Sequence, residues 1–220
     1  MNSMCPNCNS SFVIKYGRRV NINKPDIQRY FCKSCNKAFE KVIHTGREWD
    51  KNVRRAIVTP DKHFPYEDKP AINALIKSIE LVKPSIYVDL GDTGEWESVS
   101  MWKWKKRKRP PLEYMIPDVE KEIEAVNAGM DMIDSALDSV DCEERHFCEG
   151  NHDNWLNRFV EAYPYLSQYK LKKAIKLDER GYTYHPFGKF LKIGKLHFYH
   201  GHQYGGQYHT ANHLRKLGCN

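Results

Sequence analysis

The spacing of hydrophobic and polar positions changes several times along residues 53–220, and these changes predict alternating strands and helices. Apolar residues recur at helical intervals from Lys69 to Lys83, where Pro84 ends the stripe. Two further helices are expected, at 117–140 after Pro117 and at 207–217. Short apolar runs that indicate strands lie at 55–58, 85–90, 146–148 and 190–199, the last as a pair around a glycine turn. This alternation of strands and helices predicts an α/β domain.

Two paired cysteine motifs mark residues 1–40 as a separate module. The module contains two CxxC units that stand 23 residues apart, and their cysteines are Cys5, Cys8, Cys32 and Cys35. This spacing allows four thiolates to surround one structural Zn²⁺ ion. A segment this short buries too little apolar surface to fold unaided, so we expect the metal to supply much of its stability.

A short hairpin is expected between the two cysteine motifs. Residues 12–19 form a strand pattern that turns at Gly17, and residues 28–31 form the return strand. Residues 41–52 are polar and basic without clear periodicity, which predicts a linker to the domain at 53–220.

The N-terminal module resembles the zinc ribbons that open many insertion-sequence transposases. The resemblance covers residues 4–40 and rests on the CPxC motif, a KxGRR turn, and a QRYxCKSC motif followed by Phe39. It implies contact with nucleic acid, whose phosphates would be neutralised by Lys15, Arg18, Arg19 and Arg29. The alternatives are a ribbon that binds protein and a ribbon that only stabilises the N-terminal region.

Charge and composition narrow the classes of function. The 220 residues carry a formal charge of +7; residues 1–55 hold 12 Lys/Arg against 4 Asp/Glu, and the remainder holds 23 against 24. The basicity is therefore concentrated at the ribbon, which suits a polyanion partner. No run of about 18 apolar residues and no signal-peptide pattern occurs, so we expect a cytoplasmic protein without membrane contact. The seven cysteines are an odd number, which favours metal binding over a disulfide framework.

Polar residues that ligate metals follow the predicted strands. The motifs are Asp61-x-His63, Gly91-Asp92, Gly150-Asn151-His152-Asp153 and His200-Gly201-His202. Because each motif follows a strand pattern, we expect these side chains to project into one crevice. Carboxylate, amide and imidazole groups are ligands for Mn²⁺, Fe²⁺ and Zn²⁺, and a carboxylate such as Asp92 can bridge two ions.

In this order the motifs read DxH, GDxxE, GNHD and HGH, and this run resembles the calcineurin-like metallophosphoesterase superfamily over about residues 53–220. The resemblance implies a metallophosphoesterase-type β-sandwich flanked by helices, with a dinuclear metal site at one edge. It also implies the ligands, which are Asp61 and His63 for the first ion, Asp92 as the bridge, and Asn151 and His200 for the second ion. Mn²⁺ is favoured for both positions, and Fe²⁺ and Zn²⁺ are the alternatives.

The implied reaction is hydrolysis of a phosphate ester. A hydroxide that bridges the two ions would attack phosphorus, His152 would stabilise the developing charge or protonate the leaving oxygen, and Asp153 would orient His152. The family pattern continues with a further strand and a GHTH motif that gives one histidine to each ion. This motif is missing before residue 220, and His202, His209 and His213 do not match it. We therefore expect the sequence to be a fragment of a longer protein.

A basic and aromatic segment follows the bridging aspartate. Residues 96–109 hold three tryptophans and six Lys/Arg, an alternation that suits base stacking and phosphate neutralisation. The residues expected to contact nucleic acid are Trp102, Trp104, Lys105, Lys106 and Arg107. The alternative is a solvated loop whose tryptophans pack under the helix at 117–140.

Three functions stay open at this level. The first is a phosphodiesterase that acts on nucleic acid, with DNA favoured, or on nucleotides. The second is a phosphomonoesterase that acts on phosphoprotein or a small molecule, and the third is a non-catalytic nucleic-acid-binding protein with an incomplete metal site. The motifs do not separate the first two, because both need the same phosphate chemistry. The basic ribbon and the basic aromatic segment at 96–109 favour nucleic acid.

Overall fold

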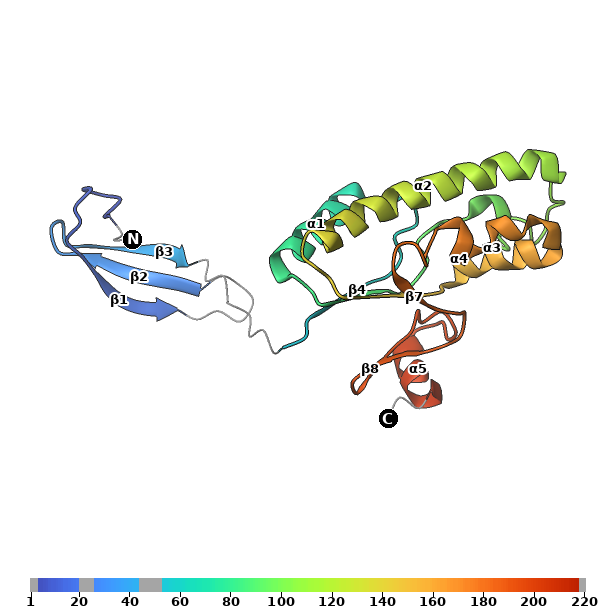
Figure 1. Cartoon of the computed structure of the whole chain (residues 1–220). Helices are drawn as coiled ribbons and strands as arrows, with labels where there is room; N and C mark the ends of the chain where they lie inside the picture. The colour runs from blue at the N-terminus through green and yellow to red at the C-terminus, as the bar shows by residue number, and fades with distance from the viewer. Residues whose placement is uncertain (1–3, 20–25, 44–52, 218–220) are drawn as a thin grey trace. The chain divides into compact units, whose positions relative to one another are not determined.

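The structure is a computed structural model that describes residues 4–19, 26–43 and 53–217 (Figure 1). These residues belong to two compact units, Met1–Val53 and Arg54–Asn220. None of the helices within the described ranges combines the length and the apolar character that crossing a bilayer requires.

The first unit contains a three-stranded antiparallel sheet. Its strands are β1 (Val13–Arg19), β2 (Asp26–Cys32) and β3 (Lys37–Ile43), with β2 in the centre. The expected hairpin is confirmed, but the turn at Gly17 is wrong, because β1 continues through Gly17 with a shift of register against β2. A glycine within a strand often marks such a bulge. β3 takes up residues 41–43 of the expected linker, and residues 44–52 of that linker lie outside the described residues.

The second unit is built on a parallel four-stranded sheet. Its strands, adjacent in chain order, are β4 (Ala56–Thr59), β5 (Ile86–Asp89), β6 (Glu144–Cys148) and β7 (Tyr182–His185). The helices between them are α1 (Lys69–Val82), η1 (Glu97–Val99), α2 (Leu112–Asp138), α3 (Asn151–Ala162), η2 (Pro164–Tyr169) and α4 (Leu171–Ala174). The expected α/β class is confirmed, and the parallel order brings the carboxyl ends of all four strands to one edge.

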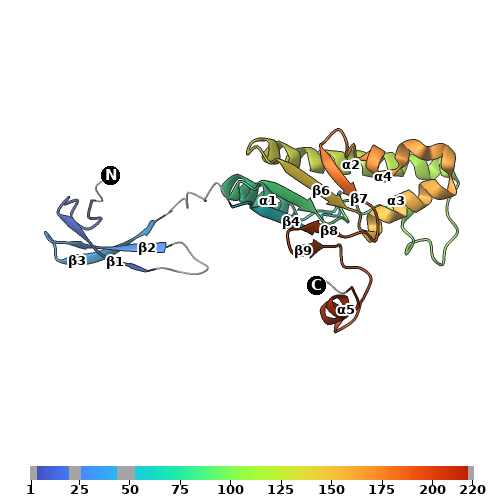
Figure 2. The ribbon, with the colours of Figure 1, turned by 60° about the horizontal axis from the view of Figure 1, so that its bottom comes forward.

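Helices pack on one face of this sheet and a hairpin packs on the other (Figure 1, Figure 2). On the helical face, Tyr87 and Phe147 join the main core with apolar residues of α1, α2 and α3. On the second face, Val88 and Cys148 pack with Leu191 of the hairpin formed by β8 (Leu191–Ile193) and β9 (Leu196–Phe198). This hairpin confirms the strand pair expected at 190–199, and α5 (His209–Leu217) follows it.

The helix boundaries show where packing overrides local signals. The Asp68 side chain accepts a hydrogen bond from the Ala71 N–H at 3.1 Å, which caps the start of α1 at Lys69, where the apolar stripe predicts that the helix begins. The expected start at 117 is wrong, because α2 begins at Leu112 and contains Pro117. Proline removes one backbone hydrogen bond near the start of the helix, whereas Met115 and Val119 on either side of it are buried in the core.

Candidate metal centre

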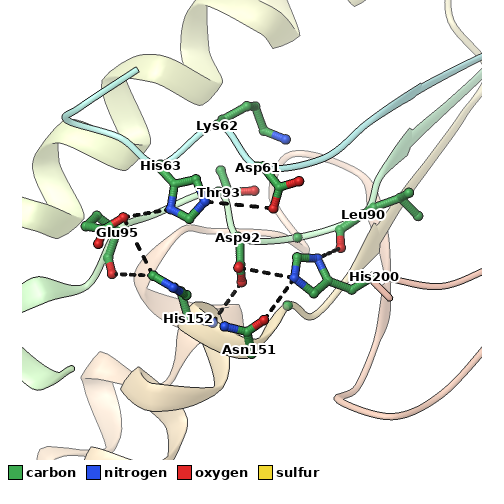
Figure 3. A network of polar contacts seen from close by, with 12 residues as sticks. Asp61, Lys62, His63, Leu90, Asp92, Thr93, Glu95, Asn151, His152 and His200 are labelled. Carbon is green, nitrogen blue, oxygen red and sulfur yellow. Dashed lines mark hydrogen bonds and ion pairs between the residues drawn. The ribbon is translucent and has the colours of Figure 1, made fainter. Parts of the chain in front are cut away.

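The loops that follow β4 and β5 run side by side at the carboxyl edge of the parallel sheet. Backbone N–H groups join them, from Leu90 to the Thr59 oxygen at 2.9 Å, from Asp61 to Gly91 at 3.0 Å and from His63 to Asp92 at 3.0 Å. Figure 3 shows that the start of α3 and His200 lie beside these loops. The structure therefore brings residues of all four predicted motifs together.

Three residues of the site have a backbone conformation that residues with a side chain rarely adopt. The φ angle is 52° at Asp61, 50° at His63 and 51° at Asp92. Such positions cost about 1–3 kcal/mol each and concentrate at functional sites. Gly150 permits the close approach of α3 to this edge, because a Cβ atom there would lie 2.2 Å from Asp92 Oδ1.

Asp92 is buried in the middle of the site. Its Oδ2 lies 3.1 Å from His200 Nε2, and its Oδ1 accepts the backbone N–H of His152 at 2.7 Å. Burial opposes its ionisation, but His200 and that N–H outweigh burial and lower the pKa of Asp92. Burial likewise lowers the pKa of His200, yet the Asp92 carboxylate outweighs it and raises that pKa. His200 Nε2 also lies 3.1 Å from Asn151 Oδ1, so Asn151 belongs to the same group.

Glu95 joins two histidines on the other side of Asp92 (Figure 3). Its Oε2 lies 2.7 Å from His63 Nδ1, at an angle that makes no hydrogen bond, and 3.6 Å from His152 Nδ1. The main-chain oxygen of Glu95 lies 3.0 Å from His152 Nδ1. Glu95 is the last residue of the GDxxE motif, but it has no role in the ligand set that the resemblance implies, and its place three residues after Asp92 in the same loop is the signal that could have identified it.

This arrangement forms two groups of three side chains that could each hold a metal ion. The first is Asp61, Asp92 and His200, and the second is His63, Glu95 and His152, with the ligand atoms of each group within 4.8 Å of one another. The resemblance assigns Asp61 and His63 to the same ion. Asp61 Oδ1 and His63 Nε2 are 3.8 Å apart, but in the structure the two residues belong to different groups. Nitrogen and oxygen sets of this kind fit Mn²⁺, Fe²⁺ or Zn²⁺.

Asp153 is fully buried behind this edge. Its Oδ2 accepts the N–H groups of Asp92 at 2.7 Å and Gly150 at 3.2 Å, and its Oδ1 accepts the Trp96 Nε1–H at 2.9 Å. Burial and the neighbouring Asp92 raise the pKa of Asp153 to about 7. Within the described residues none of these contacts reaches the His152 ring. The structure therefore gives Asp153 the role of joining the Asp92 loop to the start of α3, and Glu95 takes the position beside His152.

The residue between Asp61 and His63 is a buried lysine. Lys62 Nζ lies 2.7 Å from Asp89 Oδ1, and only 3% and 2% of the two side chains are exposed. Asp89 Oδ1 also accepts the N–H of Gly91 at 3.0 Å. This ion pair anchors the loop after β4 to the end of β5. The motif Asp61-x-His63 leaves position 62 unspecified, and a single lysine in a loop gives no sign in the sequence that it is buried.

The four cysteines of the first unit lie together. Cys5 Sγ is 3.6 Å from Cys35 Sγ, and Cys8 Sγ is 3.6 Å from Cys32 Sγ. Zinc–sulfur bonds of about 2.3 Å in a tetrahedron place the sulfurs about 3.8 Å apart. The group therefore can hold the structural zinc ion that the CxxC spacing predicts.

The basic residues of the ribbon lie on β1 and β2. Lys15 is exposed, whereas Arg19 and Arg29 lie 3.8 and 3.6 Å from the carboxylate of Glu40. Arg18 lies on β1, but its side chain is outside the described residues. Exposed ion pairs contribute only about 0–1 kcal/mol, so these arginines can exchange Glu40 for another anion.

The basic and aromatic segment places its three tryptophans differently. Trp96 is fully buried in the main core, and Trp104 is half-buried and donates from Nε1 to the Ser98 oxygen at 2.9 Å. Trp102 is 69% exposed. The cations expected to contact nucleic acid are exposed, and they are Lys105, Lys106 and Arg107. The packed alternative therefore applies to Trp96, which joins the core that contains residues of α2. Trp104 is held instead by its hydrogen bond to Ser98, and Trp102 faces solvent.

Comparisons with known proteins give a phage protein as a relative. No protein-family model and no solved structure matches the chain. The chain is similar to the Gene 54 protein of Mycobacterium phage D29, with 26% identity over 158 residues, or 69% of this chain. The match covers 58% of the phage protein, so the chain spans little more than half of its length. The name of that protein states no activity, so the function has to be inferred from the site.

Proposed function

We propose that residues 54–220 form a metal-dependent phosphoesterase that hydrolyses phosphodiester bonds of nucleic acid or nucleotides. The observation that supports this proposal is the meeting of two metal-ligand groups around Asp92 at the carboxyl edge of a parallel sheet. Open α/β sheets bind their substrates at this edge. The resemblance of the motifs to metallophosphoesterases supplies the class of reaction.

The nitrogen and oxygen ligands would hold two divalent ions, for which Mn²⁺ is our first choice. The residues that we assign to these ions are Asp61, His63, Asp92, Asn151 and His200. The other two members of the second group have different roles in this proposal: Glu95 supports His63, and His152 contacts the substrate. When bound, such ions lower the pKa of water to give a nucleophile near neutral pH and neutralise charge on the phosphoryl oxygens. Glu95 would support His63 through its charge, because its carboxylate lies 2.7 Å from Nδ1, the second nitrogen of that ring.

His152 is the residue that we assign to the substrate. The main-chain oxygen of Glu95 can only accept a hydrogen bond, so Nδ1 of His152 carries a proton. The ring stacks on Trp155 with a centroid separation of 3.9 Å. These contacts fix the ring and leave Nε2 for the phosphate. In the imidazolium form, Nε2 donates a hydrogen bond to a phosphoryl oxygen or a proton to the leaving oxygen.

Two further assignments belong to the same proposal. The hairpin β8–β9 would be part of the second sheet of a metallophosphoesterase-type sandwich, since Leu191 packs on the sheet face opposite the helices. The zinc ribbon would anchor nucleic acid, with DNA favoured, through Lys15, Arg19 and Arg29.

The test is hydrolysis of bis-p-nitrophenyl phosphate and p-nitrophenyl phosphate by the full chain with added Mn²⁺. We expect faster turnover of the diester, and we expect His152→Ala to keep its metal but lose about 10²-fold or more in rate. His209→Ala removes an exposed histidine of α5 and serves as the control. Hydrolysis of the monoester alone would favour a phosphomonoesterase. Hydrolysis of neither ester by metal-loaded protein would favour a nucleic-acid-binding protein, and an unchanged rate in His152→Ala would exclude the role given to His152.

A further inference from the structure

The segment between η1 and α2 is held in place at several points. Trp104 donates to the Ser98 oxygen at 2.9 Å, and Lys103 Nζ lies 2.8 Å from Glu97 Oε1. A third contact joins Arg158 of α3 to Met101, with 3.3 Å between Nη1 and Sδ. These contacts fix the chain on both sides of Trp102, whose ring stays exposed. The structure therefore presents this ring without the need to order a loose loop.

Trp102 borders a pocket of about 390 Å³ beside the metal centre. The pocket is lined by Met101, Trp102, Lys105, Asn151, Trp155 and His202. Asn151 belongs to both places, since its Oδ1 lies 3.1 Å from His200 Nε2. Trp155 belongs to both as well, because its ring stacks against the ring of His152. A group in this pocket would lie next to a phosphate bound at the metal centre.

The lining of the pocket suits a flat aromatic ring. Met101, Trp102 and Trp155 supply apolar surface, and the volume lies within the range of about 300–1,000 Å³ that ligand pockets have. Polar groups are few, and they belong to Lys105, Asn151 and His202. Lys105 Nζ lies 5.3 Å from the centre of the Trp102 ring. A nucleobase can use all of these features, by stacking on tryptophan and by hydrogen bonding at its edge.

A second hollow, of about 440 Å³, shares Trp102 and Lys105 with the first. Its lining is Trp102, Lys103, Lys105, Lys106 and Arg107, which makes it strongly cationic. An apolar pocket followed by a cationic hollow matches the alternation of base and phosphate along a nucleic acid strand. A single nucleotide would occupy the first and leave the second without a partner. A base paired in a duplex would not reach Trp102, because its faces are already stacked.

We propose that this surface binds single-stranded nucleic acid. One base stacks on Trp102 in the pocket beside Asn151, and neighbouring phosphates lie against Lys105, Lys106 and Arg107. The position of the scissile phosphate at the metal centre rests on the proposed function, whereas the binding of the strand does not.

Fluorescence anisotropy of a labelled thymidine tetranucleotide tests the binding in the full chain. Trp102→Ala should weaken binding by about 5- to 150-fold, which corresponds to the loss of about 1–3 kcal/mol of stacking. Trp102→Phe should retain most of the affinity. Tyr114→Ala, which removes an exposed aromatic ring from α2, should match the wild type. Changing Lys105, Lys106 and Arg107 together to glutamine should flatten the dependence of affinity on salt concentration.

Cleavage of the same tetranucleotide separates the failure of this inference from that of the proposed function. Trp102→Ala should raise KM and leave kcat close to the wild-type value. Equal binding and equal KM in Trp102→Ala and the wild type would overturn the binding site and leave the phosphoesterase intact. Weakened binding in a protein that cleaves no ester would support the binding site and overturn the proposed function. Competition by thymidine 5′-monophosphate as strong as that by the tetranucleotide would contradict a strand that uses both hollows.

Discussion

Replacing Asp153 by asparagine tests how the candidate metal centre is held together. The two oxygens of Asp153 accept three N–H groups, from Asp92, Gly150 and Trp96, at a fully buried position. Asparagine has nearly the same shape but one accepting oxygen instead of two. If that oxygen keeps both backbone bonds, the new NH₂ group faces the Trp96 Nε1–H, so that a donor meets a donor.

The expected loss of stability follows from the number of buried donors that have no acceptor in the variant. In Asp153→Asn there are two, the Trp96 Nε1–H and the new NH₂ group, and each costs about 1–3 kcal/mol. We therefore expect the free energy of unfolding to fall by about 2–6 kcal/mol. For a unit of this size, the midpoint of thermal unfolding should fall by at least about 4 °C.

Urea unfolding followed by tryptophan fluorescence measures this loss in Asp153→Asn, Trp96→Phe and the double variant. Trp96→Phe removes the opposing donor, so the cost of Asp153→Asn should be smaller by about 1–3 kcal/mol in that background. An equal cost in both backgrounds would refute the reasoning, because it would show that the Trp96 N–H does not meet Asp153. Wild-type stability in Asp153→Asn would refute it as well.

Three further changes test separate parts of the molecule. Cys32→Ser should abolish zinc binding by the four-cysteine group and expose β2 to protease; mass spectrometry that finds wild-type zinc content would contradict that site. Glu95→Gln should lower diester hydrolysis by about 10–100-fold, since it removes the negative charge that lies 2.7 Å from His63 Nδ1 and 3.6 Å from His152 Nδ1. Glu161→Gln on the exposed side of α3 should leave the rate unchanged, and equal rates in both variants would count against the role of Glu95. Lys62→Met should lower the free energy of unfolding by about 3–5 kcal/mol, because it leaves Asp89 charged and unpaired in the interior; a loss of under about 1 kcal/mol in urea unfolding would show that the pair contributes little.

The elements that could be predicted from the sequence are those with a local signal. β5 is buried on both faces, which produces the continuous apolar run that marks it as a strand. The meeting of Asp61 and Asp92 in one candidate site could be predicted because they follow such runs, and parallel strands bring their carboxyl ends to one edge. The CxxC spacing predicts the cysteine group for a similar reason, since four thiolates need only two short turns.

What could not be predicted depends on contacts between distant segments. Asp153 bonds the N–H of Asp92 across 61 positions of sequence, so its burial cannot be read from the motif that contains it. Lys62 meets Asp89 across 27 positions in the same way. The alternation of tryptophans around residue 103 looks uniform in the sequence, yet Trp104 bonds inward to Ser98 while Trp102 faces solvent. Pro117 gives a strong local signal for a helix start, and the burial of Met115 overrides it.

The central claim is that Asp92 organises a two-metal phosphoesterase site, and the bound Mn²⁺ in the wild type and in Asp92→Asn tests it most directly. The measurement is Mn²⁺ per chain after equilibrium dialysis, beside hydrolysis of bis-p-nitrophenyl phosphate by the same samples. We predict that the wild type binds two Mn²⁺ ions and hydrolyses the diester, and that Asp92→Asn loses both properties while it keeps the zinc of the cysteine group. Wild-type Mn²⁺ content and turnover in Asp92→Asn would contradict the account, and so would a wild-type protein that binds no Mn²⁺ and hydrolyses the diester equally well without it.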